Sequence, residues 1–300
     1  MKKLLLIAVA ALAIVACKKD KDEPVAPNGG NGNNGGGGST PQTEQPVPVP
    51  AGFVKKIEVT GQETKTTTFN VENNVLKGWT EVTPQGTVTK TLDYDGKNLK
   101  KYTYESNIAG QGAMKIEYDF TYKNNKLAEV KRTRSNMSDI YDVVVDDKGR
   151  ITSKTVRAVP GGWEGGNVWT ATFTYTNNSL VVKGPQGQTY SYTYENENVK
   201  KLQSDTGVYT FGYNTDVVND LNFEYFRWVA IVELFTRHSQ VTLGDPRVGD
   251  PFVESSKNLL SSNGTHEFIV TEKQGTNKPK TVVKKFGGSI APYATIRYSY

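Results

Sequence analysis

The feature that most constrains this 300-residue chain is a short hairpin motif that recurs along it. In each copy, two aromatic or β-branched residues at a spacing of two precede a polar turn and then an apolar residue, as in Phe120-Thr121-Tyr122-Lys123-Asn124-Asn125-Lys126-Leu127. The second residue of each pair is, in chain order, Val71, Tyr94, Tyr122, Val145, Tyr175, Tyr194 and Tyr213. These positions lie about 19 to 30 residues apart, which leaves room for two strands and two turns in each copy. The repeat therefore predicts a meander of antiparallel hairpins.

Turn residues and strand alternation both agree with this prediction. Asn-Asn, Asp-Gly and Lys-Gly pairs supply the positive φ angles that tight hairpins need. In the copy at residues 118–122, Tyr118, Phe120 and Tyr122 alternate with Asp119 and Thr121, so one sheet face is aromatic and the other is polar. We predict an all-β, mainly antiparallel fold, in which a long hairpin meander forms a strongly curved sheet or open barrel. The aromatic face is either its packed core or a groove for an apolar or sugar ligand.

One segment departs from the pattern. Residues 221–235 are apolar nearly all round at helical spacing, which predicts one buried helix near 221–235. Glu224, Arg227 and Glu233 interrupt it, so it is not a transmembrane segment. Such a helix could fill the concave side of a curved sheet.

The amino terminus predicts a processed and anchored chain. A basic head precedes an apolar run from Leu4 to Ala16, which is too short to span a bilayer. The run ends in Ile14-Val15-Ala16-Cys17, and Cys17 is the only cysteine of the chain. This pattern resembles the lipobox of bacterial lipoprotein precursors. The resemblance implies cleavage before Cys17 and its acylation by fatty acids such as palmitate. The alternative is an uncleaved signal with an incidental cysteine.

The residues after Cys17 predict a tether and a location. Lys18 directly follows the cysteine, which by resemblance to known sorting rules disfavours retention in the inner membrane. The charged cluster at 18–23 is similar to the surface-export signal of Bacteroidota-type lipoproteins, and the alternative is a plain charged tether. Residues 24–50 are rich in Gly, Asn and Pro and cannot pack a core. We therefore expect a lipid anchor in the outer membrane, with the domain at the cell surface or facing the periplasm.

This organisation divides the chain into three parts. Residues 1–16 are the predicted lipoprotein signal peptide, residues 17–50 the acylated cysteine and flexible tether, and residues 51–300 a single β-hairpin-repeat domain.

Composition argues against several classes of function. One cysteine and two histidines exclude a Cys-based or His-rich metal site, and we expect no metal and no cofactor. A formal charge of +5 is too balanced to predict a nucleic-acid partner. Ser239 follows His238 without the surrounding motif of a hydrolase nucleophile, and no pair of carboxylates stands out. We predict that the protein is not an enzyme and has no catalytic residues.

The stretch from Pro160 to Trp169 is the most unusual of the globular part. It is a glycine-rich loop that contains Trp163 and ends in Trp169. Both tryptophans are candidate ligand-binding residues, because exposed large aromatic side chains can stack on a sugar ring or grip a partner. The alternative is that the loop is a flexible turn and Trp169 begins a strand and packs inward.

The order of these segments resembles a known family. A series of Y-x-Y-turn-L hairpins, a helix, a glycine loop leading to Ser256-Lys257-Asn258-Leu259, and closing strands that end in Tyr298-Ser299-Tyr300 are similar to a lipid-anchored domain family of unknown function with a porin-like fold. The resemblance covers residues 51–300 and implies no known activity. The segment Asp146-Asp147-Lys148-Gly149-Arg150-Ile151-Thr152 also resembles the YD repeats of surface toxins and adhesins.

Together these features predict a non-enzymatic outer-membrane lipoprotein that binds a glycan or a protein at the cell surface. Two alternatives stay open. The protein could carry a lipid or another apolar ligand in the concave face of its sheet, or it could be a structural component of the envelope.

Overall fold

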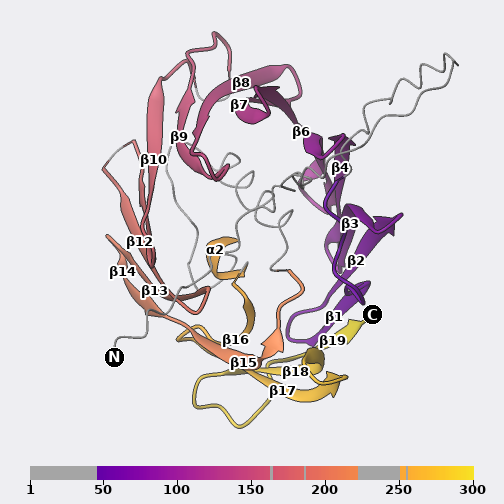
Figure 1. The fold of residues 1–300 in the computed structure, drawn as a ribbon. Coiled ribbons are helices and arrows are strands. Elements are labelled where there is room, and N and C mark those ends of the chain that lie inside the picture. Colours follow the sequence, from indigo (N-terminus) through magenta and orange to yellow (C-terminus); the bar gives the residue numbers. More distant parts are fainter. Residues whose placement is uncertain (1–45, 163–164, 186, 222–250, 255) are drawn as a thin grey trace, which may run out of the picture. The chain divides into compact units, whose positions relative to one another are not determined.

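The computed structural model describes residues 46–162, 165–185, 187–221, 251–254 and 256–300. Within these residues, nineteen strands form one antiparallel sheet (Figure 1). Their bounds are β1 Lys56–Gly61, β2 Lys65–Glu72, β3 Val75–Thr83, β4 Gly86–Asp95, β5 Asn98–Ile108, β6 Gly112–Lys123, β7 Lys126–Arg134, β8 Met137–Val145, β9 Ile151–Val156, β10 Trp169–Tyr175, β11 Ser179–Lys183, β12 Thr189–Glu195, β13 Asn198–Ser204, β14 Gly207–Thr210, β15 Gly212–Val218, β16 Asn258–Ser262, β17 His266–Gln274, β18 Lys278–Phe286 and β19 Ala294–Ser299.

The sheet follows the order of the chain and returns to its start. Neighbouring strands pair antiparallel, and the last strand, β19, pairs with β1 over its full length. β14 and β15 are separated by Phe211 alone; β14 pairs with β13 and β15 pairs with β16. The result is a nearly closed, barrel-like sheet, in which the strands follow one another around a ring (Figure 1). The predicted all-β meander is confirmed.

The repeated motif produces the curvature of the sheet. In five hairpins the register shifts directly before the second aromatic or β-branched residue of the motif, at Val71, Tyr94, Tyr122, Val145 and Tyr194. A bulge of this kind bends a strand and increases its twist. The same bulge in five hairpins therefore adds curvature to the meander at regular intervals.

In three copies the motif also ties its hairpin to the preceding copy. The hydroxyl of Tyr122 donates to the carbonyl oxygen of Leu99 at 3.1 Å, and that of Tyr94 donates to the oxygen of Leu76 at 2.9 Å. Tyr213 donates in the same way to Val199, at 2.9 Å. In each case the acceptor is the apolar residue that ends the preceding motif. The tyrosine hydroxyl, which a phenylalanine would lack, thus joins neighbouring hairpins at these three positions.

The predicted turn geometry is confirmed in most copies and wrong in one. The pairs at 73–74 and 124–125 have φ between 51° and 62°, and Gly96 and Gly149 are also left-handed. Asn177 and Asn178 do not have positive φ. Their hairpin, β10–β11, keeps one straight register without a bulge, so its turn does not need the same twist.

The aromatic face of the sheet is the packed core. The largest fully buried side chains on it are Tyr102, Tyr118, Tyr141 and Tyr192. The short helix α2 (Pro251–Glu254) covers part of this face, because Phe252 lies with its ring 4.9 Å from that of Tyr192. Figure 1 shows α2 inside the ring of strands, so the aromatic face is the concave one.

The predicted helix at 221–235 lies outside the described residues except for Leu221, which packs against the core. No helix in the described ranges is long and apolar enough to cross a membrane.

Candidate functional site

An open pocket of about 410 Å³ lies where β1, β18 and β19 end or begin. We call it the aromatic pocket. It is lined by Gln62, Phe286, Ser289, Ala291, Pro292 and Tyr293. Its volume is within the range of small-ligand sites in proteins.

The loop between β18 and β19 is shaped by its own backbone. Gly288 has φ 77°, and the amide of Ser289 donates to the oxygen of Phe286 at 2.9 Å, which closes a tight turn. The hydroxyl of Ser289 donates to the oxygen of Ala291 at 3.3 Å. The amide of Tyr293 then donates to the oxygen of Lys284 at 2.7 Å and returns the chain to the sheet.

Closure of the sheet brings Gln62 to this loop. Its backbone amide donates to the oxygen of Tyr293 at 3.0 Å, just beyond the pairing of β1 with β19. Gly61 permits this close approach, because it has φ 134° and a Cβ atom there would lie 2.6 Å from the oxygen of Tyr293. Only glycine adopts such a conformation without strain.

Aromatic rings form the wall of the pocket. The rings of Phe286 and Tyr293 meet edge to face, with centroids 4.7 Å apart and an interplanar angle of 72°. His266, which is opposite Phe286 in the register of β17 and β18, is buried with its ring 4.7 Å from that of Phe286. Phe286 itself remains 45% exposed, and Ile290 in the same loop is 92% exposed. Phe286 is the exposed apolar residue that lines the pocket, whereas Ile290 does not line it.

Phe286 is exposed because of its position along β18. Val282, Lys284 and Phe286 follow one another at a spacing of two and share a face. Their exposed fractions are 1%, 8% and 45%, so this face leaves the core toward the end of the strand. The pocket is therefore at the rim of the sheet, where the buried face emerges into solvent.

A lysine and a glutamate form an ion pair next to the pocket. The ammonium group of Lys284 lies 5.0 Å from the centre of the Tyr293 ring. It donates to both carboxylate oxygens of Glu63, at 2.8 and 3.0 Å. The cation is thus held by a carboxylate and an aromatic face, and the pocket wall has no net charge.

The tryptophans predicted from the sequence lie elsewhere. Trp169 begins β10 and is 8% exposed, with its ring 6.2 Å from that of Tyr141 and the ammonium group of Lys154 5.1 Å from its centre. This is the environment of a packing residue, and its role in ligand binding stays a prediction. Trp163 and Cys17 lie outside the described residues, as does His238.

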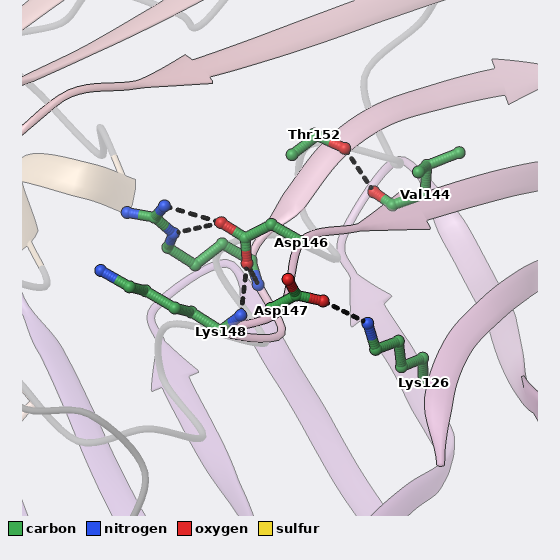
Figure 2. A network of polar contacts seen from close by, with 7 residues as sticks. Lys126, Val144, Asp146, Asp147, Lys148 and Thr152 are labelled. Atoms are coloured by element: carbon green, nitrogen blue, oxygen red, sulfur yellow. Dashed lines mark hydrogen bonds and ion pairs between the residues drawn. The ribbon is translucent and has the colours of Figure 1, made fainter. Parts of the chain in front are cut away.

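In the turn that resembles a YD repeat, the polar side chains are engaged in hydrogen bonds with other residues of this chain (Figure 2). The carboxylate of Asp146 accepts hydrogen bonds from the amides of Lys148 and Arg150, both at 2.9 Å, and from the Arg150 guanidinium at 2.8 Å. Burial alone would raise the pKa of Asp146, but these hydrogen bonds hold it below its ordinary value. Asp147 pairs with Lys126 at 2.9 Å, and Thr152 donates to Val144 (Figure 2). We interpret this turn as structural.

Among the described residues, no group of three or more His, Cys, Asp or Glu side chains is arranged to hold a metal ion. The residues lining the aromatic pocket offer an amide, a hydroxyl, a phenol and ring faces, which are groups that bind and orient a ligand.

Sequence reasoning missed the aromatic pocket, although a signal was present. The stretch Phe286-Gly287-Gly288-Ser289-Ile290-Ala291-Pro292-Tyr293 is a glycine-containing loop between two aromatic residues. The same reasoning that selected Pro160 to Trp169 applies to it.

Comparison with known proteins finds likeness to solved structures alone. No known protein family matches the chain, and no curated protein matches it. Among the solved structures that match is a porin-like protein from Bacteroides uniformis ATCC 8492, with 14% sequence identity and a TM-score of 0.43. The match covers 86% of this chain and 99% of that protein. At this TM-score the likeness carries no argument about function. The predicted lipoprotein family and the YD-repeat likeness stay predictions.

Proposed function

We propose that this protein is a non-enzymatic binding module on an outer-membrane lipoprotein, and that the aromatic pocket holds its glycan or protein ligand. The observation that carries the proposal is the exposed ring of Phe286, which lies against Tyr293 in an open pocket of about 410 Å³. Exposed aromatic side chains beside polar groups are a recurrent feature of binding sites.

The chemistry next to the pocket favours binding over catalysis. General acid–base catalysis needs a titratable side chain that can reach the reacting atoms. Glu63, the carboxylate nearest to the lining residues in the chain, is held by Lys284. The remaining polar groups of the lining are suited to hydrogen bonding.

The polar face of the sheet supports attachment by a lipid anchor. Between β5 and β6 this face carries the ion pairs Lys101–Glu117 and Lys115–Glu105, both at 3.3 Å. Strands that cross a bilayer turn apolar side chains toward the lipid. A charged face is suited to water, which favours a domain held near the membrane by acyl chains on Cys17.

The anchor is tested by labelling. Cells that express the parent or Cys17→Ala are grown with radiolabelled fatty acid, and we expect label in the parent alone. Protease added to intact cells then separates the two locations, because a surface domain is digested and a periplasmic one is protected. Equal label in Cys17→Ala would overturn the lipoprotein proposal.

The binding role is tested by capture from intact cells and their surroundings. The full-length parent, Phe286→Ala and the control Val144→Ala are compared, since Val144 is an exposed apolar residue outside the lining of the pocket. We expect Phe286→Ala to lose a glycan or protein that the parent and the control retain. Mass analysis of co-purified lipid is run in parallel. A stoichiometric lipid in all three proteins would favour the carrier alternative.

A further inference from the structure

We infer that the aromatic pocket binds the ring of a neutral sugar, seated against Phe286 and hydrogen-bonded by the side chain of Gln62. This inference rests on the proposed function and names the ligand class of the same site. It follows from the shape, the polarity and the charge of the pocket.

The first argument concerns the apolar wall. A pyranose ring has faces formed largely by C–H bonds, and such a face packs well against an aromatic ring. Phe286 offers this surface, because it is 45% exposed and its ring is fixed by contacts with His266 and Tyr293, both at 4.7 Å between centroids. A ring already held in place loses little conformational freedom when a ligand binds.

The second argument concerns the polar groups. Sugar hydroxyls both donate and accept hydrogen bonds. The affinity of a sugar for a protein falls when a buried hydroxyl has no hydrogen-bond partner. The carboxamide of Gln62 also donates and accepts, and its side chain is exposed at the edge of the pocket. Ser289 donates its hydroxyl proton to Ala291 and can still accept a hydrogen bond. The pocket thus presents an apolar wall together with polar groups, as an amphipathic ligand requires.

The third argument concerns charge. The loop from Phe286 to Tyr293 contains no charged residue, and the ammonium group of Lys284 is engaged by Glu63 and the ring of Tyr293. An anionic sugar or a phosphate would find no available cation among the lining residues. The lining therefore favours a neutral ligand.

A protein partner fits this site less well. A stable protein interface buries about 800 Å² on each side around a central group of apolar anchors. Around the pocket, Phe286 and Ile290 are the large apolar side chains with high exposure in the described part of the chain. A single sugar ring needs no more apolar surface than Phe286 provides.

The test uses the full-length protein and four variants. Calorimetry measures binding of neutral hexasaccharides of glucose, mannose, galactose and xylose, with a hexasaccharide of galacturonic acid as the anionic probe. We expect the parent to bind at least one neutral probe and to bind the anionic probe at least ~10-fold more weakly. Phe286→Ala should weaken neutral binding by ~10- to 100-fold, the range of an aromatic anchor. Phe286→Trp should retain it.

Two further variants separate the pocket from its surroundings. Gln62→Leu removes the hydrogen bonds and keeps the volume, so binding should weaken by about 10-fold. Ile290→Ala is the matched control, because Ile290 is exposed in the same loop but does not line the pocket. Its binding should stay within about twofold of the parent. Urea midpoints measured for each variant show that it is folded.

The outcomes distinguish the inference from the proposed function. If Phe286→Ala binds neutral sugars as tightly as the parent does, the inference is overturned, since the sugar then binds elsewhere. If the parent binds no neutral sugar, and Phe286→Ala loses a protein or an acidic ligand instead, the inference is overturned but the proposed function still holds. If Phe286→Ala changes no interaction of any kind, both fail.

Discussion

Two loops of similar composition differ in what their aromatic residues can do. The loop at 160–169 and the loop at 286–293 each contain glycines beside large aromatic residues. In each case a lysine of a neighbouring strand lies over the aromatic ring that ends the loop. The lysine to ring-centre distances are nearly equal, 5.1 Å for Lys154 and Trp169 and 5.0 Å for Lys284 and Tyr293. Trp169 is nevertheless 8% exposed, whereas Phe286 is 45% exposed.

The difference comes from where each strand meets the core. Trp169 begins β10 opposite Val156 and shares its face with Ala171 and Phe173, all of which are buried. Phe286 ends β18 at the rim, where the same kind of face is no longer covered. Loop composition therefore does not determine whether an aromatic side chain is exposed, whereas its position relative to the end of the core does.

The largest expected effect concerns the buried member of this comparison. Trp169→Ala should lower the free energy of unfolding by roughly 3–5 kcal/mol, because it removes a large aromatic side chain from a packed environment. Urea unfolding followed by circular dichroism measures the change. An unaltered midpoint would show that Trp169 is not a packing residue and would return it to the candidates for ligand binding.

The next effect concerns Gly61, where the end of β1 passes close to Tyr293 at the aromatic pocket. Gly61→Ala should cost roughly 1–3 kcal/mol of stability, because its Cβ atom would meet the oxygen of Tyr293 and its φ of 134° is unfavourable for alanine. We also expect weaker ligand binding, since Gln62 would move away from Tyr293. Gly264→Ala is the control, because Gly264 has φ 79° but open space around it. An equal loss of binding in both variants would argue against a specific role for the approach.

A third lysine–aromatic pair adds a prediction about how stability depends on pH. The ammonium group of Lys90 lies 5.1 Å from the centre of the Trp79 ring, and both side chains donate to Glu81. Burial raises the pKa of Glu81, but Lys90, Lys65 and the indole N–H outweigh it and lower the pKa below its ordinary value.

The sign of the pH effect follows from this lowered pKa. A carboxyl group with a lowered pKa in the folded state stabilises the protein above its unfolded pKa, and the contribution is lost as pH falls through the folded pKa. Glu81→Gln should therefore cost roughly 1–2 kcal/mol at neutral pH, and this cost should shrink as pH falls from the unfolded pKa of about 4.3 through the lowered folded pKa. Urea unfolding over a series of pH values measures this difference. A cost that does not change with pH would assign the effect of Glu81 to packing.

The smallest effects are expected on the stability of the exposed loop. Phe286→Ala should lower the free energy of unfolding by about 1 kcal/mol, because nearly half of the residue is exposed at 45% and only part of its packing is lost. Ile290→Ala should lower it by less than about 0.5 kcal/mol, because Ile290 is 92% exposed. Thermal melts of both variants beside Trp169→Ala provide the comparison. A loss at Phe286 as large as that at Trp169 would mean that the pocket wall is part of the core.

Much of the fold could be predicted because the relevant signals are local. The alternation of Tyr118, Phe120 and Tyr122 with polar residues predicted one aromatic and one polar face, and the motif spacing predicted the hairpins. Burial of the aromatic face was one of two alternatives, and the structure decides for it. The hydrogen bond from Tyr122 to Leu99 could not be predicted, since it depends on the register between one hairpin and the next. The bulge that places this hydroxyl is likewise visible only in the paired strands.

The hairpins, most of their turns and the alternation of side chains within strands could be read from the amino-acid sequence, because these depend on neighbours within a few residues. The turn at Asn177 and Asn178 is an exception. Alternation alone places Trp169 on the same face as Phe173. The tertiary structure alone decided that Gln62 lies beside Tyr293, because this contact requires β1 to pair with β19 from the other end of the domain. It also decided that Phe286 is exposed. Side-chain direction repeats with a local period of two, whereas exposure depends on which distant segments cover that face of the sheet.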